Sequence, residues 1–131
     1  MNNAPEIFTI IEKAESKLLT AHINFENGRY DDVASRAYYA AYHAISAVLI
    51  QKGMVFSSHA QTIGAFNREF IKTGIFPREF TNMIQRLFED RQTGDYDSAS
   101  SLDRETAQEN IRSAETIIVA IKEYLKSQGA F

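Results

Sequence analysis

Apolar side chains recur every three to four residues along most of the chain, the spacing typical of amphipathic helices. The first stripe consists of Ile7, Ile10, Ile11, Ala14, Leu18, Ala21 and Phe25. It follows Pro5, which suits a first helical turn, and it stops at Asn27-Gly28, a common helix end. The pattern therefore predicts a long first helix with one face on a core.

A second helix is predicted from Asp31 to Lys52, ending at Gly53. Its apolar positions are unusually small, because six of them are alanine, with tyrosines between them. These alanines are Ala34, Ala37, Ala40, Ala41, Ala44 and Ala47. Small residues let neighbouring helices approach closely, so we expect this helix to be central.

Three further segments complete the pattern. Ser57-Ser58 favours the start of a short third helix that ends at Gly74, and Pro77 opens a fourth. Residues 93–101 carry no stripe and indicate an exposed loop, after which a last helix runs from Asp103 to Ser127. The whole predicts an all-α, up-and-down bundle of four long helices plus one short helix, as a single domain over residues 1–131.

Composition narrows the function. The 131 residues include no cysteine, which excludes a disulfide, a thiol nucleophile and a cysteine-ligated metal. A net charge of −3 argues against general coating of DNA or RNA. The start of the chain lacks a signal-peptide pattern, and the longest nearly apolar stretch, 37–50, is too short for a bilayer. We expect a cytoplasmic protein that does not bind membranes.

Motifs for metal and phosphate-loop chemistry are missing from the sequence. It contains no Glu-x-x-His and no His-x-x-x-His, and its three histidines, His22, His43 and His59, lie in different segments. No glycine-rich phosphate loop or dinucleotide fingerprint occurs either. We therefore expect no cofactor and no built-in metal site.

Polar residues on otherwise apolar helices are the remaining candidates. We interpret Arg36 as half of an inter-helix salt bridge, and Arg91 as the partner of Asp95 or Asp90. His59 lies near a helix start, where free backbone N–H groups favour an anion.

The other two histidines and the tyrosines have simpler interpretations. Glu26 lies one turn on from His22, to which we assign no role, and His43 fits a core or interface histidine. Packing explains the tyrosines more simply than a nucleobase platform does.

Several segments taken together resemble a known family. They are Gly28-Arg29-Tyr30, Ser35-Arg36-Ala37-Tyr38-Tyr39-Ala40-Ala41-Tyr42-His43-Ala44, Ser58-His59 and Arg91-Gln92-Thr93-Gly94-Asp95-Tyr96. The chain resembles HEPN domains over nearly its whole length, and more narrowly the small stand-alone HEPN proteins of bacteria and archaea. The resemblance implies a helical bundle that forms a homodimer and pairs with a small nucleotidyltransferase in toxin–antitoxin systems.

The resemblance also implies a chemistry, because many HEPN domains are metal-independent endoribonucleases with an Arg-x(4–6)-His motif at the dimer cleft. The arginine of that motif matches Arg91. The histidine does not carry over, since residues 96 to 98 are Tyr96, Asp97 and Ser98. Arg36 and His43 have the spacing but lie in the second helix, so we treat that match as accidental.

Three functions stay open at this point. The first is a homodimeric module that binds a protein partner or a nucleotide or RNA ligand, with a polar cluster of Arg36, His59, Arg91, Asp95 and Tyr96, and with Tyr39 beside it. The second is a metal-independent endoribonuclease toxin with Arg91 and Arg36 on the phosphate and His59 transferring the proton. The third is an ion-pair network that only pins the 95–96 segment onto the second helix.

The aromatic content bears on the dimer. The predicted second to fourth helices and their connections carry Tyr38, Tyr39, Tyr42, Phe66, Phe70, Phe76, Phe80 and Phe88. This load exceeds what a small bundle core must hold, so we expect a symmetric interface to bury the surplus.

Overall fold

The structure is a computed structural model that describes residues 3–96 and 102–130. These residues form five α-helices and one π-helical segment, and none of them lies in a β-strand. The elements are α1 (Ala4–Glu26), α2 (Tyr30–Gln51), α3 (His59–Phe66), the π-helical η1 (Asn67–Ile71), α4 (Glu79–Tyr96) and α5 (Arg104–Ser127). The predicted all-α bundle of four long helices and one short one is confirmed.

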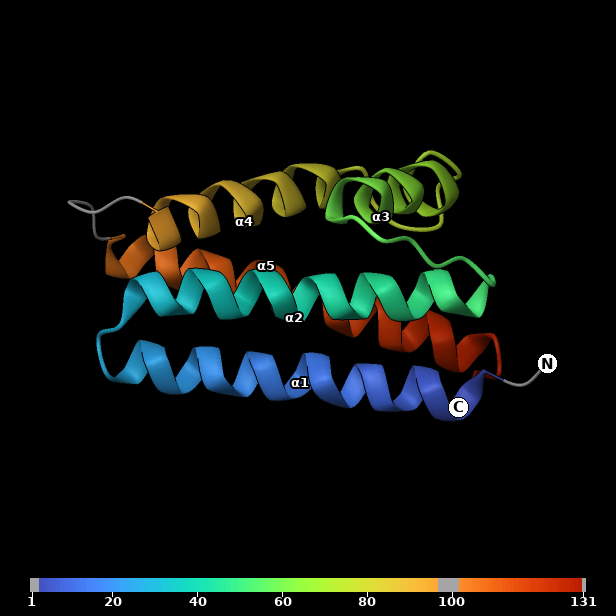
Figure 1. The fold of residues 1–131 in the computed structure, drawn as a ribbon, viewed down its shortest axis with the longest axis horizontal. Helices are drawn as coiled ribbons and strands as arrows, with labels where there is room; N and C mark the ends of the chain where they lie inside the picture. The colour runs from blue at the N-terminus through green and yellow to red at the C-terminus, as the bar shows by residue number, and fades with distance from the viewer. Residues whose placement is uncertain (1–2, 97–101, 131) are drawn as a thin grey trace.

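The helix α2 is the centre of the bundle, and it contacts each of the other four α-helices. Figure 1 shows α1 on one side of α2 and α4 on the other, with α5 packed behind them. The short helix α3 and the segment η1 lie near the start of α4, away from its C-terminal end (Figure 1).

The alanines of α2 explain why this helix is central. All six are buried, with at most 2% of their surface exposed. A slim helix face brings the axes of its neighbours close and lets their larger side chains fill the space. The prediction of a central alanine-rich helix is therefore confirmed.

Many of the aromatic side chains pack against one another inside the single chain. Phe66, Phe70 and Phe76 lie with their ring centroids 5.6 Å apart, and Tyr124 of α5 closes the group edge-on. These three phenylalanines, Phe80 and Tyr38 are all buried. Tyr39, Tyr42 and Phe88 are only half-buried, so the core of one chain takes up part of the aromatic load, and burial of the rest by a second copy stays a prediction.

The end of α4 also departs from prediction. Residues 93–96 continue the helix instead of entering a loop, while the rest of the predicted loop, 97–101, lies outside the described residues. Gly94 explains the difference: a Cβ there would lie 3.1 Å from the Asp31 carbonyl oxygen. This glycine is a point of close helix–helix packing and not a chain break.

The other helix ends follow the sequence signals. Ser58 caps α3 by accepting a 3.1 Å bond from the Gln61 N–H, and Asp103 caps α5 by accepting from Thr106. Gly28 and Gly53 follow α1 and α2 with φ of 72° and 76°, a conformation that favours glycine. No helix within residues 3–96 and 102–130 is long and apolar enough to span a membrane.

Candidate functional site

Three helices bring Tyr38, His59 and Arg91 together. Tyr38 of α2 shares a 3.0 Å hydrogen bond between its hydroxyl and Nδ1 of His59, the first residue of α3. The guanidinium of Arg91 on α4 lies 5.6 Å from the centroid of the same tyrosine ring. The residues that flank this contact, Tyr39 and Tyr42, complete what we call the His59–Arg91 cluster: Tyr38, Tyr39, Tyr42, His59 and Arg91.

The orientation of His59 is fixed from two sides. Its ring stacks on Tyr42 with centroids 4.1 Å apart and planes 28° apart. The Tyr42 hydroxyl in turn bonds to Thr62 Oγ1 at 3.2 Å, and that threonine hydroxyl donates to the Ser58 carbonyl. Because Ser58 caps α3, the tyrosine, the cap and the histidine are connected as one unit.

Arg91 is held against tyrosine rings and paired with a carboxylate. Its guanidinium lies 5.2 Å from the Tyr39 ring centroid, within the range of a cation–π interaction. Its Nε donates to Asp95 Oδ2 at 3.1 Å, one turn further along α4. The predicted Arg91–Asp95 pair is confirmed, whereas Asp90 bonds instead to Arg86 and to Asn110 of α5.

The cluster shifts the proton affinities of its members. Burial raises the pKa of Tyr38 to about 12, although the nearby Arg91 opposes the rise. Burial lowers the pKa of His59, and the positive charge of Arg91 lowers it further. Near neutral pH the histidine is therefore neutral and the tyrosine hydroxyl keeps its proton.

The tautomer of His59 decides what its ring can do. When Nδ1 carries the proton, it donates to the Tyr38 oxygen and Nε2 is left with a free lone pair. That nitrogen is then able to accept a proton from a substrate hydroxyl. The opposite tautomer presents an N–H donor at the same place.

Other predicted site residues lie apart from the cluster. Arg36 is exposed on α2 and makes no ion pair or hydrogen bond with a described residue, so the predicted inter-helix salt bridge is wrong for the described chain. Tyr96 ends α4 with 72% of its surface exposed. Of the residues expected in the site, the structure gathers His59, Arg91, Asp95 and Tyr39.

The two other histidines differ in their surroundings. His22 binds Glu115 of α5 at 2.9 Å and not Glu26, because α1 and α5 pack side by side. His43 is half-buried beside Tyr39 and Tyr42. Burial lowers the pKa of His43, as do the positive charges of Lys13 and Lys17.

A cavity of about 540 Å³ opens beside the cluster, between α3 and α4. Its lining combines polar and apolar groups: Tyr38, His59, Ala60, Ile63, Gly64, Asn67, Ile84, Gln85 and Phe88. This volume falls within the usual range for a small-molecule site. We call it the His59 cavity. Within the described parts of the chain, no group of three or more histidine, aspartate or glutamate side chains is arranged to hold a metal ion.

Sequence reasoning missed the central residue of the site. Tyr38 looks like a packing residue in the sequence and it is buried, yet it is the group that both His59 and Arg91 contact. The role of Tyr42 in stacking on His59 is equally invisible in the sequence. The available signal was the one-turn spacing of Tyr38 and Tyr42, which places both rings on one face of α2.

Comparison with known proteins identifies the fold and the family. Solved structures of TT1696 from Thermus thermophilus and of a HEPN domain protein from Thermotoga maritima superpose with TM-scores of 0.75 and 0.71. They cover 94% and 90% of this chain and 98% of each other chain, at 20% and 22% identity, which supports a shared fold.

Proteins found by sequence comparison share a higher identity with this chain than these two structures do. A UPF0332 protein of Thermotoga maritima is 37% identical over 87% of this chain and 86% of its own length. A Methanocaldococcus jannaschii protein named "putative toxin MJ0605" is 35% identical over 92% of this chain and 90% of its own. The model of the HEPN domain matches residues 9–124, nearly the whole helical bundle. The chain therefore belongs to the HEPN domain family.

Proposed function

We propose that this chain is a toxin-like HEPN module that binds RNA at the His59–Arg91 cluster. The proposal rests on one observation: His59 and Arg91 both contact Tyr38, His59 through the tyrosine hydroxyl and Arg91 over the ring. A relative that is 35% identical carries the name of a toxin, which supports the biological setting.

The chemistry of the cluster suits a nucleotide. Half-buried Tyr39 and Tyr42 offer aromatic surface for a base, and Arg91 offers a fixed positive charge for a phosphate. The His59 cavity is large enough for one nucleotide unit beside them. The chain as a whole is acidic, so the attraction is local and falls as salt screens it.

Arg91 must change partners to bind a phosphate. Its Nε now donates to Asp95, and only 16% of its side chain is exposed. A phosphate oxygen would replace the Asp95 carboxylate or bind the terminal nitrogens of the guanidinium. The Asp95 pair thus competes with RNA for the same cation.

Metal-independent cleavage of the bound RNA is a second candidate function, favoured by the neutral His59 next to Arg91. In such a reaction His59 Nε2 takes the proton of a ribose 2′-hydroxyl, and the 2′-oxygen attacks the adjacent phosphorus. The 5′-oxygen leaves, accepts a proton from water, and a 2′,3′-cyclic phosphate remains. Arg91 stabilises the charge that develops on the phosphate. Arg36 lies outside the cluster contacts, so we assign it no step.

One experiment separates these two functions. Labelled RNA is incubated with wild type, His59→Ala and Arg91→Ala in excess chelator, and both binding and cleavage are measured. His22→Ala and Arg112→Ala serve as matched controls, because they remove the same residue types from the α1–α5 side. All variants are first checked by circular dichroism and thermal unfolding.

The outcomes are distinct. RNA binding that only the two cluster variants weaken supports the RNA-binding module. Cleavage that only these two variants abolish adds the nuclease. If wild type neither binds nor cleaves RNA at high concentration, the RNA proposal fails. If Arg91→Ala then lowers stability alone, the ion-pair network is structural.

We also propose that the module acts as a homodimer with a nucleotidyltransferase-type protein partner. HEPN proteins are often dimers and often toxins of toxin–antitoxin pairs, and membership of this family supports both points. The partner proposal predicts that a nucleotidyltransferase encoded beside this chain co-purifies with it when both are expressed. Failure of the two purified proteins to associate at micromolar concentration would contradict it.

A further inference from the structure

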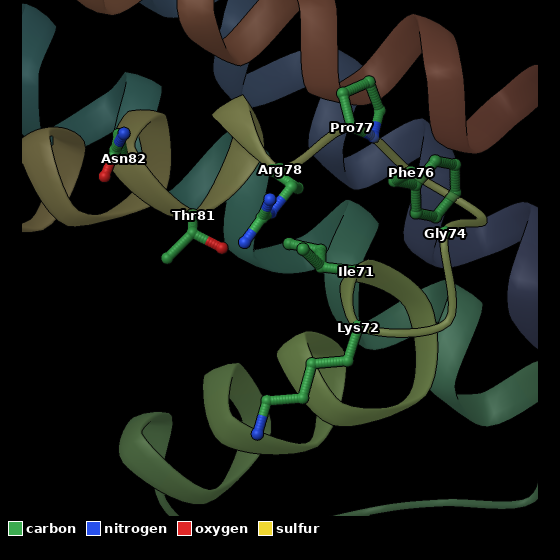
Figure 2. A pocket seen from close by; sticks show the side chains of 8 residues that line it. All are labelled: Ile71, Lys72, Gly74, Phe76, Pro77, Arg78, Thr81 and Asn82. Atoms are coloured by element: carbon green, nitrogen blue, oxygen red, sulfur yellow. The ribbon is translucent and has the colours of Figure 1, made fainter.

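A second cavity lies near the His59 cavity, where η1 ends and α4 begins. It has a volume of about 800 Å³ and is lined by Ile71, Lys72, Gly74, Phe76, Pro77, Arg78, Thr81 and Asn82. Figure 2 shows Arg78 extending from the position just before α4 toward the open space beside Thr81, and Lys72 extending from the end of η1 over the neighbouring helical ribbon. We call it the Lys72–Arg78 cavity.

The two cations of this cavity have no carboxylate partner among the described residues. The nearest acidic side chain in sequence to Lys72 is Glu69, and it is already bound by Lys52 at 3.3 Å and by Arg68 at 2.9 Å. Those bonds lower the pKa of Glu69, so it remains an anion near neutral pH. Glu79, next to Arg78, is exposed in the first turn of α4.

The local charge is therefore positive in an acidic protein. The residues that line this cavity include Lys72 and Arg78 and no aspartate or glutamate, while the whole chain carries −3. The cavity also offers Thr81 and Asn82 as polar side chains, and Phe76 and Pro77 as apolar ones. Unpaired cations beside small polar groups and an apolar floor suit a nucleic-acid backbone with its sugars.

The two cavities adjoin each other. Thr81, which lines the Lys72–Arg78 cavity, donates a 3.2 Å hydrogen bond to Asn67, which lines the His59 cavity. Both cavities are also lined by α4, through Thr81 in one and Gln85 in the other. These two residues lie about one helical turn apart, roughly 6 Å along the axis.

From this arrangement we infer that the groove between η1 and α4 is the path of an RNA strand that extends beyond the nucleotide at His59, with Lys72 and Arg78 binding its phosphates. The inference rests on the proposed RNA binding at the His59–Arg91 cluster and adds its substrate class. The substrate is a single-stranded oligonucleotide of several residues, and a mononucleotide or dinucleotide fills only the His59 end.

The test uses two probes that the protein cannot cleave, because each carries 2′-O-methyl groups. One is a labelled RNA of about 12 nucleotides and the other is a labelled dinucleotide. Fluorescence anisotropy measures the affinity of each probe at several salt concentrations. The variants are Lys72→Ala/Arg78→Ala and the charge-preserving Lys72→Arg/Arg78→Lys.

A matched control removes two positive charges elsewhere. Arg104 and Arg112 lie on α5, where Arg104 covers Phe25 of α1 and Arg112 lines a different cavity. The double variant Arg104→Ala/Arg112→Ala therefore changes the net charge equally without touching the groove. Circular dichroism checks that every variant is folded.

The expected result is a loss of about tenfold or more in affinity for the long RNA in Lys72→Ala/Arg78→Ala, with a shallower salt dependence and no change for the dinucleotide. The control and the charge-preserving variant keep wild-type affinity. If wild type and Lys72→Ala/Arg78→Ala bind the long RNA with equal affinity, the inference that RNA follows this groove is overturned. Equal losses in this variant and in Arg104→Ala/Arg112→Ala do the same, since they reflect net charge alone.

The experiment distinguishes failure of the inferred RNA path from failure of the proposed RNA binding. If Arg91→Ala weakens both probes while Lys72→Ala/Arg78→Ala weakens neither, the cluster binds RNA and only the path is wrong. If wild type binds neither probe, the proposed function itself fails.

Discussion

Tyr38 is the residue on which the candidate site depends. Its hydroxyl holds His59 Nδ1 at 3.0 Å, and its ring lies 5.6 Å from the Arg91 guanidinium. It is buried with 2% of its surface exposed, so its position is fixed by the core and not by the ligand. A rigid group that touches both functional side chains sets their relative geometry before any substrate arrives.

Tyr38→Phe tests this role with the smallest possible change. It removes the hydrogen bond to His59 but keeps the ring beneath Arg91, so RNA affinity, and cleavage if present, is expected to fall several-fold. Loss of one part-buried hydrogen bond costs about 1 kcal/mol of unfolding free energy. Urea unfolding and RNA binding measure the two effects.

Tyr42→Phe is the comparison, because it removes a bond to Thr62 that reaches His59 only through the Ser58 cap and keeps the ring stacked on His59, so a smaller loss of RNA affinity is expected. If both variants bind RNA as wild type does, the Tyr38 hydroxyl does not position the histidine.

The depressed pKa values of His43 and His59 predict how stability depends on pH. Both rings bind a proton more weakly in the folded protein than in the unfolded chain, where the pKa is about 6.5. Their contribution is fully present above that value and is lost as pH falls from about 6.5 through the folded-state pKa. The free energy of unfolding in urea is therefore expected to decrease between about pH 7 and pH 5.

The double variant His43→Gln/His59→Gln should flatten this decrease. Glu69 and Asp103, whose pKa values are lowered, titrate below this window and contribute little to it. A slope in the double variant as steep as in wild type would assign the pH dependence to other groups.

At the scale of the helix, α4 contributes Arg91 to the site, and its C-terminal end differs from the prediction. It continues to Tyr96 and packs through Gly94 onto the start of α2, and Asp31 there also accepts a 2.8 Å bond from the Leu102 N–H. This contact orients the last two turns of α4, so that Arg91 faces the tyrosines of α2. A buried Asp90–Asn110 bond of 2.9 Å anchors the same turn to α5.

Two glycine substitutions should have opposite effects on stability. Gly64→Ala adds a methyl group to α3 where nothing lies within 4 Å, so helix propensity should stabilise the protein by up to about 1 kcal/mol. Gly94→Ala places the same methyl group 3.1 Å from the Asp31 carbonyl oxygen, which belongs to helix backbone and yields little. Net destabilisation of about 1 kcal/mol is expected there. Thermal unfolding compares the two, and equal shifts would contradict the packing role of Gly94.

Asn110→Ala tests the anchor between α4 and α5. It leaves the largely buried Asp90 carboxylate with Arg86 alone, at an expected cost of about 2 kcal/mol. Gln108→Ala, at an exposed position on the same helix, serves as control. Urea unfolding curves should separate the two variants clearly. Equal stabilities would mean that Arg86 satisfies the carboxylate unaided.

The sequence predicted elements better than contacts. Periodicity located all the helices, because burial of one face imposes it directly, and the six alanines identified the central helix. It misplaced the end of α4, since a glycine in a close packing contact looks like a glycine in a loop. The salt bridge predicted for Arg36 was wrong and the Glu115 partner of His22 was not foreseen for a related reason: helix register and tertiary packing decide which charges meet. The Tyr38–His59–Arg91 contact joins three separate helices and has no local signature.

At the scale of the whole molecule, the exposed side chains bear on whether one chain or two form the functional unit. The core of one chain buries Phe66, Phe70, Phe76 and Phe80, so these four rings do not argue for a second copy. Two other side chains stay exposed outside the cluster: Arg36, which has no described ion-pair partner, and Tyr96. Both lie toward the end of the bundle where Gly94 meets Asp31.

We therefore expect a homodimer with this end of the bundle as its interface. Light scattering at micromolar concentration should give about twice the chain mass of 14.8 kDa. Arg36→Glu/Tyr96→Ser should weaken association about tenfold or more, because it reverses a charge and removes an aromatic anchor. Leu19→Ser/Ile23→Ser, which removes exposed apolar groups from α1, should leave the mass unchanged. A wild-type mass near 14.8 kDa would make the chain a monomer whose site is complete in one copy, whereas dissociation by the α1 variant alone would move the interface to α1.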